Sequence, residues 1–532
     1  MSSTYVQVQV WLDRARQPAP GAATPDRSGR WFVLGAVCVC VVLHFPALLW
    51  PLGADESGFL LITRSWDPQP DNMYGHYWVA RPPVLLWMFQ AADALGGAYM
   101  PRLFVAALAG LMVVAAYRVG VLLAGPVAGR WTAAASVALV GNPYLTAWQA
   151  KSESFGMPLV MCSCWLALEA LRCPPGRSRY ALAAGAGMVG VLAIGMKQNL
   201  TGGLVFGGVL LLGSVLRRRL SPREGSVLAG MAFLGAAVPV LAVMAWAIGS
   251  GVHLSTLWEM TYAFRSDALE TIASGPMDES QERARELVRL GVESGLAVII
   301  GWFVVSFRRA SRTQPAVAWA VVAMLLTDLA ALVLGGHYWP SYLIALIPGA
   351  ALCVALLSGV PDRRAGAMMR LLVVLMSLAT ALALWSHTAE HTDGSVNPGH
   401  YYTGMGVGRA ARPDDTILVL YGHANVVAAS GLRAPYPYLW ALPARTRDPD
   451  LARMRTVLAG PQAPTWVVES DPGDTWDLDE DDRLRRLLHT RYTYLGPLCG
   501  RTIWRRTDQQ RPSPFGVDCD RPWWDTWRVQ AR

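Results

Sequence analysis

Residues 31–57 read WFVLGAVCVCVVLHFPALLWPLGADES, an apolar run that ends on two adjacent acids, Asp55 and Glu56. A helix needs about 20 mostly apolar residues to cross a membrane, and residues 31–50 supply them. Two neighbouring carboxylates at a membrane boundary are costly to remove from water unless another group uses them. The stretch therefore predicts a membrane protein with a candidate site directly after its first span. The structural alternative is that the acids only stabilise the start of a following helix.

The composition of the whole chain agrees with a membrane location. Of the 532 residues, 53% are hydrophobic and 16% are charged, whereas typical soluble domains have about 25% charged residues. Disorder is excluded for the same reason. We predict eleven membrane spans: 31–50, 103–124, 131–147, 155–171, 180–196, 199–216, 226–249, 290–307, 315–334, 341–359 and 369–386.

The distribution of arginine predicts the orientation of these spans. Arginines gather in the N-terminal tail and in every second loop, around Arg130, Arg177, Arg218, Arg308 and Arg364. The positive-inside rule places this side in the cytoplasm, so an odd number of spans places the C-terminal part outside. We therefore expect a multi-pass protein of the cell membrane. The net charge of +8 follows from this topology, and we predict no nucleic-acid partner.

The pattern divides the chain into three parts. They are a cytoplasmic tail (1–30), a membrane domain (31–386) with outer loops 51–102 and 250–289, and an extracytoplasmic domain (387–532). In the first outer loop, the apolar stretch 81–96 is too short to span and predicts a helix in the membrane interface.

The last part has a soluble composition and alternates strand and helix patterns. Strands are predicted at 416–421, 465–470, 492–498 and 502–506, and helices at 448–459 and 479–489. Such alternation predicts a small α/β domain. Its cysteines, Cys499 and Cys519, lie on the oxidising side of the membrane, where we expect a disulfide between them rather than two free thiols.

Further polar and aromatic residues lie at the outer ends of other spans. They are Arg81 before a Pro pair, Lys151 and Glu153 before the fourth span, Lys197 and Gln198 after the fifth, and His337, Tyr338 and Tyr342 near the start of the tenth. The chain has only two lysines, and both fall on this side. A compact ammonium group suits a phosphate oxygen. The structural alternatives remain open: helix capping, anchoring in lipid head groups, and an aromatic belt at the interface.

The order of these sites resembles the GT-C superfamily of membrane glycosyltransferases, over about residues 31–386. The resemblance is strongest to protein O-mannosyltransferases and to the aminoarabinose transferase of lipid A. It consists of an acidic pair after the first span, a basic-Pro-Pro element, an acid at the fourth span, a lysine after the fifth and an aromatic turn before the tenth. In addition, residues 418–422 (LVLYG) and 430–433 (SGLR) resemble the outer domain of actinobacterial members.

The resemblance implies a polytopic helical fold and an inverting enzyme that uses a polyprenyl-phosphate sugar on the outer face. It implies that Asp55 is the catalytic carboxylate, with Glu56 beside it and Glu153 as a second acidic site. Lys197 matches a phosphate-contacting lysine, and Gln198 follows it. Arg81 stands where members usually have lysine before the Pro pair, and His337 and Tyr338 match loosely. We assign the phosphate to Arg81, Lys197 and Gln198, and the substrate to His337, Tyr338 and Tyr342.

This chemistry agrees with the residue types. The leaving group is an ionised phosphate, which requires cations, and the acceptor hydroxyl requires a base such as a carboxylate. A single base and a fixed anionic leaving group favour one inverting displacement. No resident metal is predicted, although the acids leave a divalent cation open as an alternative cofactor.

Two other functions remain as alternatives. A transporter or flippase would place its polar residues mid-helix, often on repeated or broken helices, whereas those of this chain lie at helix ends. A non-catalytic scaffold would use its C-terminal domain to bind a partner. For the enzyme, the sequence leaves open which sugar is moved (mannose or arabinofuranose, for example) and whether the acceptor is a protein, a wall glycan or a glycolipid.

Overall fold

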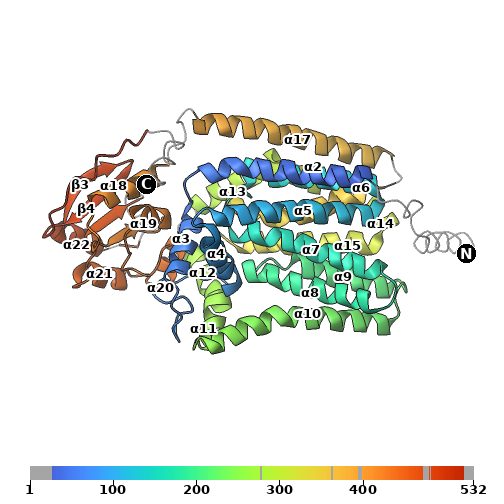
Figure 1. Cartoon of the computed structure of the whole chain (residues 1–532), viewed down its shortest axis with the longest axis horizontal. Coiled ribbons are helices and arrows are strands. Elements are labelled where there is room, and N and C mark those ends of the chain that lie inside the picture. The colour runs from blue at the N-terminus through green and yellow to red at the C-terminus, as the bar shows by residue number, and fades with distance from the viewer. Residues whose placement is uncertain are drawn as a thin grey trace, which may run out of the picture.

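The computed structural model of this chain describes residues 27–275, 278–360, 363–392, 398–470, 478–479 and 481–520. Most of the predicted cytoplasmic tail therefore lies outside the described residues. The described residues form a bundle of long helices with a C-terminal lobe at one end, and the N-terminal end of α2 lies at the other (Figure 1).

A helix occupies each of the eleven segments that the sequence assigns to the membrane. These helices are α2 (Arg27–His44), α5 (Met100–Ala124), α6 (Pro126–Val140), α7 (Ser152–Arg172), α8 (Arg177–Met196), α9 (Gly202–Leu216), α10 (Pro222–Gly249), α14 (Leu296–Thr313), α15 (Pro315–Leu334), α16 (Ile347–Ser358) and α17 (Arg363–Thr392). Among the described residues, eight helical segments are long and apolar enough to cross a membrane, or nine if one bent pair is a single span. The number eleven therefore stays a prediction.

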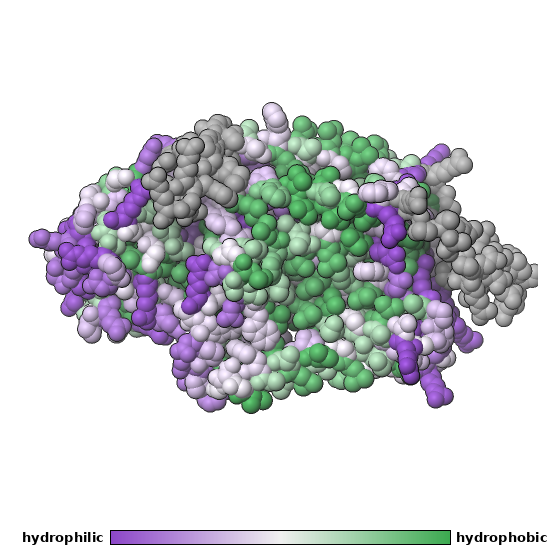
Figure 2. Space-filling view, in the orientation of Figure 1, coloured by the Kyte–Doolittle hydropathy of each residue, from purple (hydrophilic) through white to green (hydrophobic). Residues whose placement is uncertain are grey.

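Apolar side chains cover the outside of the bundle, as expected where lipid is the solvent. Figure 2 shows hydrophobic residues along the middle of the molecule and hydrophilic residues towards both ends. Large apolar side chains on α10, α14 and α17, such as Phe233, Val305 and Trp385, are more than two-thirds exposed. The predicted fold class, a polytopic helical membrane protein with a small C-terminal α/β region, is confirmed.

Two span boundaries and one predicted loop differ from the sequence prediction. The predicted span 131–147 ends as a helix at Val140, because Asn142 and Pro143 begin a short 3-10 turn, η2 (Pro143–Leu145). The predicted loop 250–289 is largely helical, with α11 (Leu254–Trp258), a π-helical turn η3 (Glu259–Ala263), α12 (Phe264–Ser274) and α13 (Asp278–Glu293). The predicted span 290–307 begins later, since the chain bends by 73° between α13 and α14.

Short helices connect the bundle to the C-terminal lobe. α3 (Ala54–Arg64) contacts α4 (Pro83–Gly96), and α12 contacts α20 (Ala441–Arg447). All four lie in the region between the two parts (Figure 1). α4 occupies the stretch where the sequence predicts an interfacial helix. The turn before α16 is a further 3-10 helix, η4 (Pro340–Leu346). These elements place polar side chains from distant parts of the chain at one end of the bundle.

A four-stranded mixed sheet forms the C-terminal lobe. It consists of β1 (Ile417–Leu420), β2 (Trp466–Glu469), β3 (Tyr492–Leu498) and β4 (Arg501–Arg506), in the order β1-β2-β4-β3. β1 pairs with β2 in parallel, and the other pairs are antiparallel. Because successive residues of a strand point to opposite faces, β1 contributes to two cores. Ile417 and Val419 join the core shared with the bundle, and Leu418 and Leu420 join a separate core.

Helices of the lobe pack on both sides of this sheet region. α18 (Gly399–Ala410) packs against α19 (Ala424–Ser430), and α19 in turn contacts α3 of the membrane part. α21 (Ala452–Ala459) and α22 (Arg483–Arg491) belong to the other core. Both begin about four residues later than predicted, because Asp448 and Asp479 accept hydrogen bonds from backbone N–H groups of the first helical turn instead of lying inside it.

A disulfide joins Cys499, just after β3, to Cys519 near the end of the described lobe. This is the pair that the sequence predicts. It closes a loop with a sequence separation of 20 residues around strand β4.

Candidate active site

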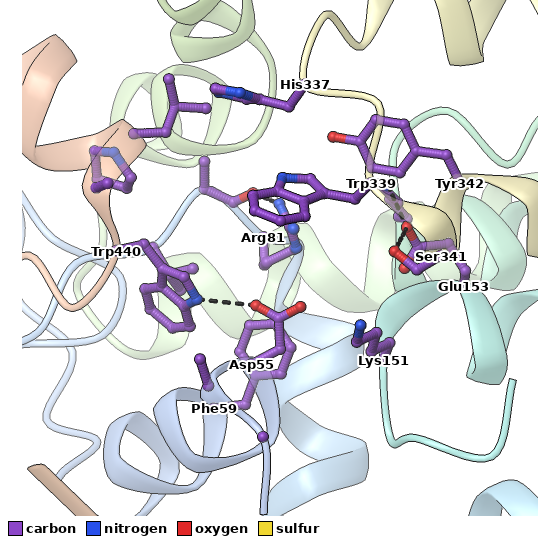
Figure 3. A pocket seen from close by; sticks show the side chains of 18 of the residues that line it. Asp55, Phe59, Arg81, Lys151, Glu153, His337, Trp339, Ser341, Tyr342 and Trp440 are labelled. Carbon is purple, nitrogen blue, oxygen red and sulfur yellow. Dashed lines mark hydrogen bonds and ion pairs between the residues drawn. The ribbon is translucent and has the colours of Figure 1, made fainter. Parts of the chain in front are cut away.

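A cavity of about 480 Å³ lies where the bundle meets the C-terminal lobe. Most of the residues that the sequence assigns to a site line it: Asp55, Glu56, Arg81, Glu153, Lys197, His337 and Tyr342. Gln198 and Tyr338 are not among the lining residues. Figure 3 shows how the labelled side chains face one another across this cavity.

Asp55 lies in the first turn of α3, where the helix places its carboxylate beside the cavity. Its Oδ1 accepts a hydrogen bond of 2.9 Å from the indole N–H of Trp440, which belongs to the C-terminal lobe. Its second oxygen has no hydrogen-bond partner among the described residues and points towards the side of the cavity where Lys151 lies (Figure 3). Asp55 therefore presents one carboxylate oxygen to a bound molecule.

Glu56 is the most constrained acid of the site and is 1% exposed. Its carboxylate accepts two hydrogen bonds from Arg102, at 2.7 and 2.6 Å, and one each from the backbone N–H groups of Ala150 and Gly53, both at 2.8 Å. Burial alone would raise the pKa of Glu56, but the Arg102 charge and these hydrogen bonds hold it below its ordinary value. With all its lone pairs engaged, Glu56 fits a positioning role better than the predicted catalytic one.

Glu153, at the start of α7, forms an ion pair with Lys197 from the turn after α8. The distance from Lys197 Nζ to Glu153 Oε1 is 2.5 Å, and both side chains are buried. Ser341 donates a longer hydrogen bond of 3.4 Å to the same oxygen. The ammonium group also lies 4.2 Å from the ring centre of Tyr342, a cation–π distance. These contacts hold the lysine in place at the cavity wall.

Two arginines join Lys197 in this wall, Arg81 and Arg265 from α12. Burial and the neighbouring charge of Arg81 lower the pKa of Arg265 to about 10. Burial also lowers the pKa of Lys197, helped by the charges of Arg81 and Arg265 and opposed by Glu153. Three cations thus lie close enough to repel one another, an arrangement that a bound anion would stabilise.

A single carbonyl oxygen orients this group. The Ala80 oxygen accepts hydrogen bonds from Arg81 (3.1 Å), Arg265 (3.2 Å) and the side-chain amide of Gln198 (3.3 Å). Gln198 also donates to the Thr261 carbonyl at 2.8 Å. Gln198 therefore lies behind the cavity wall and links its segments, whereas the sequence assigns it to phosphate binding.

His337 lies in the turn before η4 and is 8% exposed. Neither of its ring nitrogens has a hydrogen-bond partner among the described residues. Burial, together with the charges of Arg283, Arg445 and Arg265, lowers the pKa of His337 to about 4. A neutral imidazole at this position has one donor and one acceptor for a polar ligand. Tyr338, the next residue, instead directs its hydroxyl to the Val333 carbonyl at 3.4 Å.

Several cavity residues are absent from the sequence prediction. They are Arg265, Ser341, Trp440 and Arg445. Lys151, which the sequence names beside Glu153 as one of only two lysines, also lines the cavity. Arg265 lies in a segment predicted as an outer loop, and Trp440 and Arg445 lie in the C-terminal lobe. No local pattern distinguishes these three residues from ordinary surface arginines and tryptophans.

The fold and the cavity define a class of protein: a polytopic membrane protein with an acid and a group of cations in a cavity at one end of its bundle. No family model and no curated protein matches the sequence. Solved structures do match. ArnT from Cupriavidus metallidurans in the apo state superposes with a TM-score of 0.61 at 13% identity, over 90% of this chain and 98% of ArnT.

Two further structures extend this likeness. ArnT of the same organism bound to undecaprenyl phosphate gives a TM-score of 0.58 at 14% identity, over 90% of this chain and 98% of ArnT. The Archaeoglobus fulgidus oligosaccharyltransferase tethered to an acceptor peptide gives 0.50 at 12% identity, over 93% of this chain and 77% of that protein. ArnT, the lipid A aminoarabinose transferase, and the oligosaccharyltransferase belong to the GT-C superfamily of membrane glycosyltransferases. This chain has the GT-C fold, as the sequence resemblance implies.

Proposed function

We propose that this protein is an inverting glycosyltransferase that moves a sugar from a polyprenyl phosphate to an acceptor hydroxyl at the outer face of the membrane. One observation carries the proposal: one cavity at the lobe end of the bundle holds the Asp55 carboxylate together with a group of cations, of which Lys197 is buried and Arg81 and Arg265 are half-buried. The GT-C fold, shared with a protein solved with undecaprenyl phosphate bound, supports the same class of donor.

The donor phosphate is assigned to Arg81, Lys197 and Arg265. Charge-assisted hydrogen bonds from arginine and lysine to phosphate are about twice as strong as neutral ones. The leaving polyprenyl phosphate accumulates negative charge as its bond to the sugar breaks, and fixed cations stabilise that charge without reorganising. Mutual repulsion among the cations is relieved when the phosphate binds.

Asp55 is assigned as the general base. The acceptor oxygen attacks the anomeric carbon while the bond from that carbon to the phosphate oxygen breaks. The acceptor proton passes to the free Asp55 oxygen, and the polyprenyl phosphate leaves as an anion. One displacement inverts the anomeric centre, whereas retention would need a second carboxylate as nucleophile beneath the sugar. Glu56 and Glu153 are bound to Arg102 and Lys197 and fit that nucleophilic role poorly.

His337 and Tyr342 are assigned to the substrate. The buried, neutral imidazole of His337 can donate to one sugar hydroxyl and accept from another. Tyr342 lies beside Lys197 and completes the wall between the phosphate and sugar positions.

The cavity residues do not fit a protein-bound metal ion. Two of its three acids, Glu56 and Glu153, are in ion pairs, and the described part of the chain contains no group of three or more His, Cys, Asp or Glu side chains placed to hold one. We therefore derive no step through a divalent cation and assign charge stabilisation to the side-chain cations.

The location of the polar residues also favours an enzyme over a transporter. The cavity lies at one end of the bundle, next to the lobe, and its residues come from helix ends and connecting turns. A transporter binds its cargo near the middle of the membrane on interrupted helices. We propose that the N-terminus is cytoplasmic and that the cavity and the lobe, residues 387–532, are extracytoplasmic.

The test is transfer of label from undecaprenyl-phosphate mannose or undecaprenyl-phosphate arabinofuranose, radiolabelled in the sugar, in membranes that contain the protein. An enzyme moves label into a product that no longer extracts with the donor, and the product has the opposite anomeric configuration. If all label stays on the donor while the protein is folded, the proposal is wrong for these donors. A retained configuration would contradict the single displacement.

A further inference from the structure

We propose that Trp440 of the C-terminal lobe is a positioning residue for catalysis: its indole N–H fixes the Asp55 carboxylate so that one oxygen faces the acceptor. This inference rests on the proposed role of Asp55 as the base. It assigns to the lobe a direct part in the reaction, through a side chain 385 residues away from the base.

The first support is the contact itself. The Trp440 Nε1 to Asp55 Oδ1 distance is 2.9 Å, and this is the hydrogen bond that holds the Asp55 side chain among the described residues. A short carboxylate side chain with one oxygen held in this way keeps a single orientation. The other oxygen then points away from Trp440 and into the cavity (Figure 3).

The second support is the surface on which the indole lies. Gly58 is three residues after Asp55, so both lie on the same face of α3. A Cβ atom at Gly58 would lie 2.4 Å from Trp440 Cζ2 and 2.5 Å from Cη2, closer than packed atoms allow. Phe59 contacts the indole from the same helix, with ring centres 5.5 Å apart. The absence of a side chain at position 58 is therefore what lets Trp440 reach Asp55.

The third support is the attachment of the segment that contains Trp440. The backbone of Trp78, in the first loop, donates to the Pro437 carbonyl at 3.1 Å. On the far side of Trp440, Arg447 pairs with Glu259, and α20 packs against α12. The indole is thus held between two elements that are themselves fixed to the membrane part.

This arrangement determines what the loss of the N–H would do. Without it, the Asp55 carboxylate can rotate, and the fraction of molecules with an oxygen correctly placed for the acceptor proton falls. Misplacement of a catalytic group by about 1 Å can lower a rate by about 100-fold. Donor binding should be unaffected, because the phosphate is assigned to Arg81, Lys197 and Arg265.

The experiment compares kcat and donor affinity in Trp440→Phe, which keeps an aromatic ring at this position and removes the indole N–H. The assay uses the radiolabelled undecaprenyl-phosphate sugar that the wild-type protein accepts and the acceptor present in its own membranes. We expect kcat to fall by about tenfold or more while donor affinity is unchanged. The matched control is Trp504→Phe in the same lobe, whose indole N–H has no partner among the described residues. It should keep the wild-type kcat.

A double-mutant cycle tests the geometry. Gly58→Ala should displace the indole and lower kcat as Trp440→Phe does. In the Trp440→Ala background the new methyl group meets no indole and keeps only a contact of 3.2 Å with Ala424 Cβ, so Gly58→Ala should cause little further loss. Thermal unfolding of each purified variant separates these effects from misfolding.

The outcomes separate a failure of the proposed function from a failure of the Trp440 positioning role. Absence of transfer by the wild-type protein contradicts the proposed function itself. Wild-type transfer with an unchanged kcat in Trp440→Phe overturns the positioning role alone. A loss of donor affinity equal to the loss of kcat, or full additivity of Gly58→Ala and Trp440→Ala, also overturns it, since Trp440 would then only support the cavity wall.

Discussion

At the scale of single residues, the two adjacent acids after the first span have different surroundings. Glu56 is surrounded by Arg102 and two backbone N–H groups, whereas Asp55 has one oxygen bound to Trp440 and one directed to the cavity. Adjacent side chains on a helix point about 100° apart, so only one of a neighbouring pair can face the same ligand. The sequence predicts that both acids belong to a site. Only the packing of the structure shows that Glu56 is engaged in hydrogen bonds and that Asp55 presents an oxygen to the cavity.

Asp55→Asn keeps the size of the side chain and its contact with Trp440 but removes the base. We expect a folded variant that binds donor normally and loses about 100- to 10,000-fold in transfer rate, the usual effect of removing a general base. The measurement is the transfer rate at saturating donor, with donor affinity determined separately. A variant that keeps more than about a tenth of the wild-type rate would move the base to another residue.

Lys197 should make donor binding sensitive to alkaline pH. Its protonated form binds phosphate, and its pKa lies below the 10.5 of an ordinary lysine because of burial and the Arg81 and Arg265 charges. The charge is therefore lost as pH rises through a lower range than for an exposed lysine. Donor affinity, measured by titration, should weaken over that range. Lys197→Arg keeps its charge, so its donor affinity should change less with pH. The same pH dependence of donor affinity in the wild-type protein and in Lys197→Arg would contradict the assignment of Lys197 to the phosphate.

At the scale of elements, the Glu56–Arg102 pair holds α3 against α5. Arg102 is 2% exposed and also donates to the backbone carbonyls of Ala47 and Trp50. Glu56→Gln leaves a buried cation without its partner, and breaking a buried pair in this way typically costs about 3–5 kcal/mol. We expect a clear decrease in Tm. Asp55→Asn, the same carboxylate-to-amide change one residue earlier, is the control and should leave Tm unchanged. If the two variants have the same Tm, the Glu56–Arg102 ion pair does not stabilise the fold.

The disulfide of the lobe can be tested chemically. Cys499–Cys519 closes a loop of about 20 residues, for which chain entropy gives roughly 3 kcal/mol of stabilisation. Alkylation without reductant, followed by peptide mapping, should leave both cysteines unmodified, and reduction should expose both. Complete labelling of the two thiols before reduction would contradict the pairing.

The helices and strands also show which features of the fold can be predicted from the sequence. Spans and strands follow from local patterns, because lipid demands long apolar runs and half-buried strands alternate. The predicted helix starts are wrong where an acid such as Asp448 caps the helix from outside instead of lying in its first turn. Several cavity residues can be predicted from the sequence, because they are polar residues at the outer ends of successive predicted spans. Trp440 and Arg265 cannot be predicted in this way, because their roles depend on tertiary packing of the lobe and of α12.

At the scale of the whole molecule, the lobe is part of the cavity. Residues Trp440 to Pro443 and Arg445 line it, and one face of β1 shares a core with the bundle. This packing explains why the membrane part and the C-terminal part are best treated as one functional unit, even though their compositions differ sharply.

We predict that this unit is oriented with its C-terminus and its cavity outside the cytoplasm. A reporter that is active only in the cytoplasm, fused after Arg532, should be silent, because the arginine-rich loops place the opposite side inside. The same reporter fused in the loop between α9 and α10, beside Arg218, should be active. Activity at the C-terminus would place the cavity on the cytoplasmic side and contradict the outer location of the reaction.

Transfer of a lipid-linked sugar at one membrane face, with Asp55 as the base, can be measured directly in proteoliposomes. They contain the purified protein, donor labelled in its sugar, and an acceptor extract from the native membranes. We expect label to move into the acceptor with the wild-type protein, and we expect Asp55→Asn, which still binds donor, to nearly abolish this transfer. Label that crosses the bilayer while remaining on its lipid, or equal transfer by both proteins, would contradict this expectation.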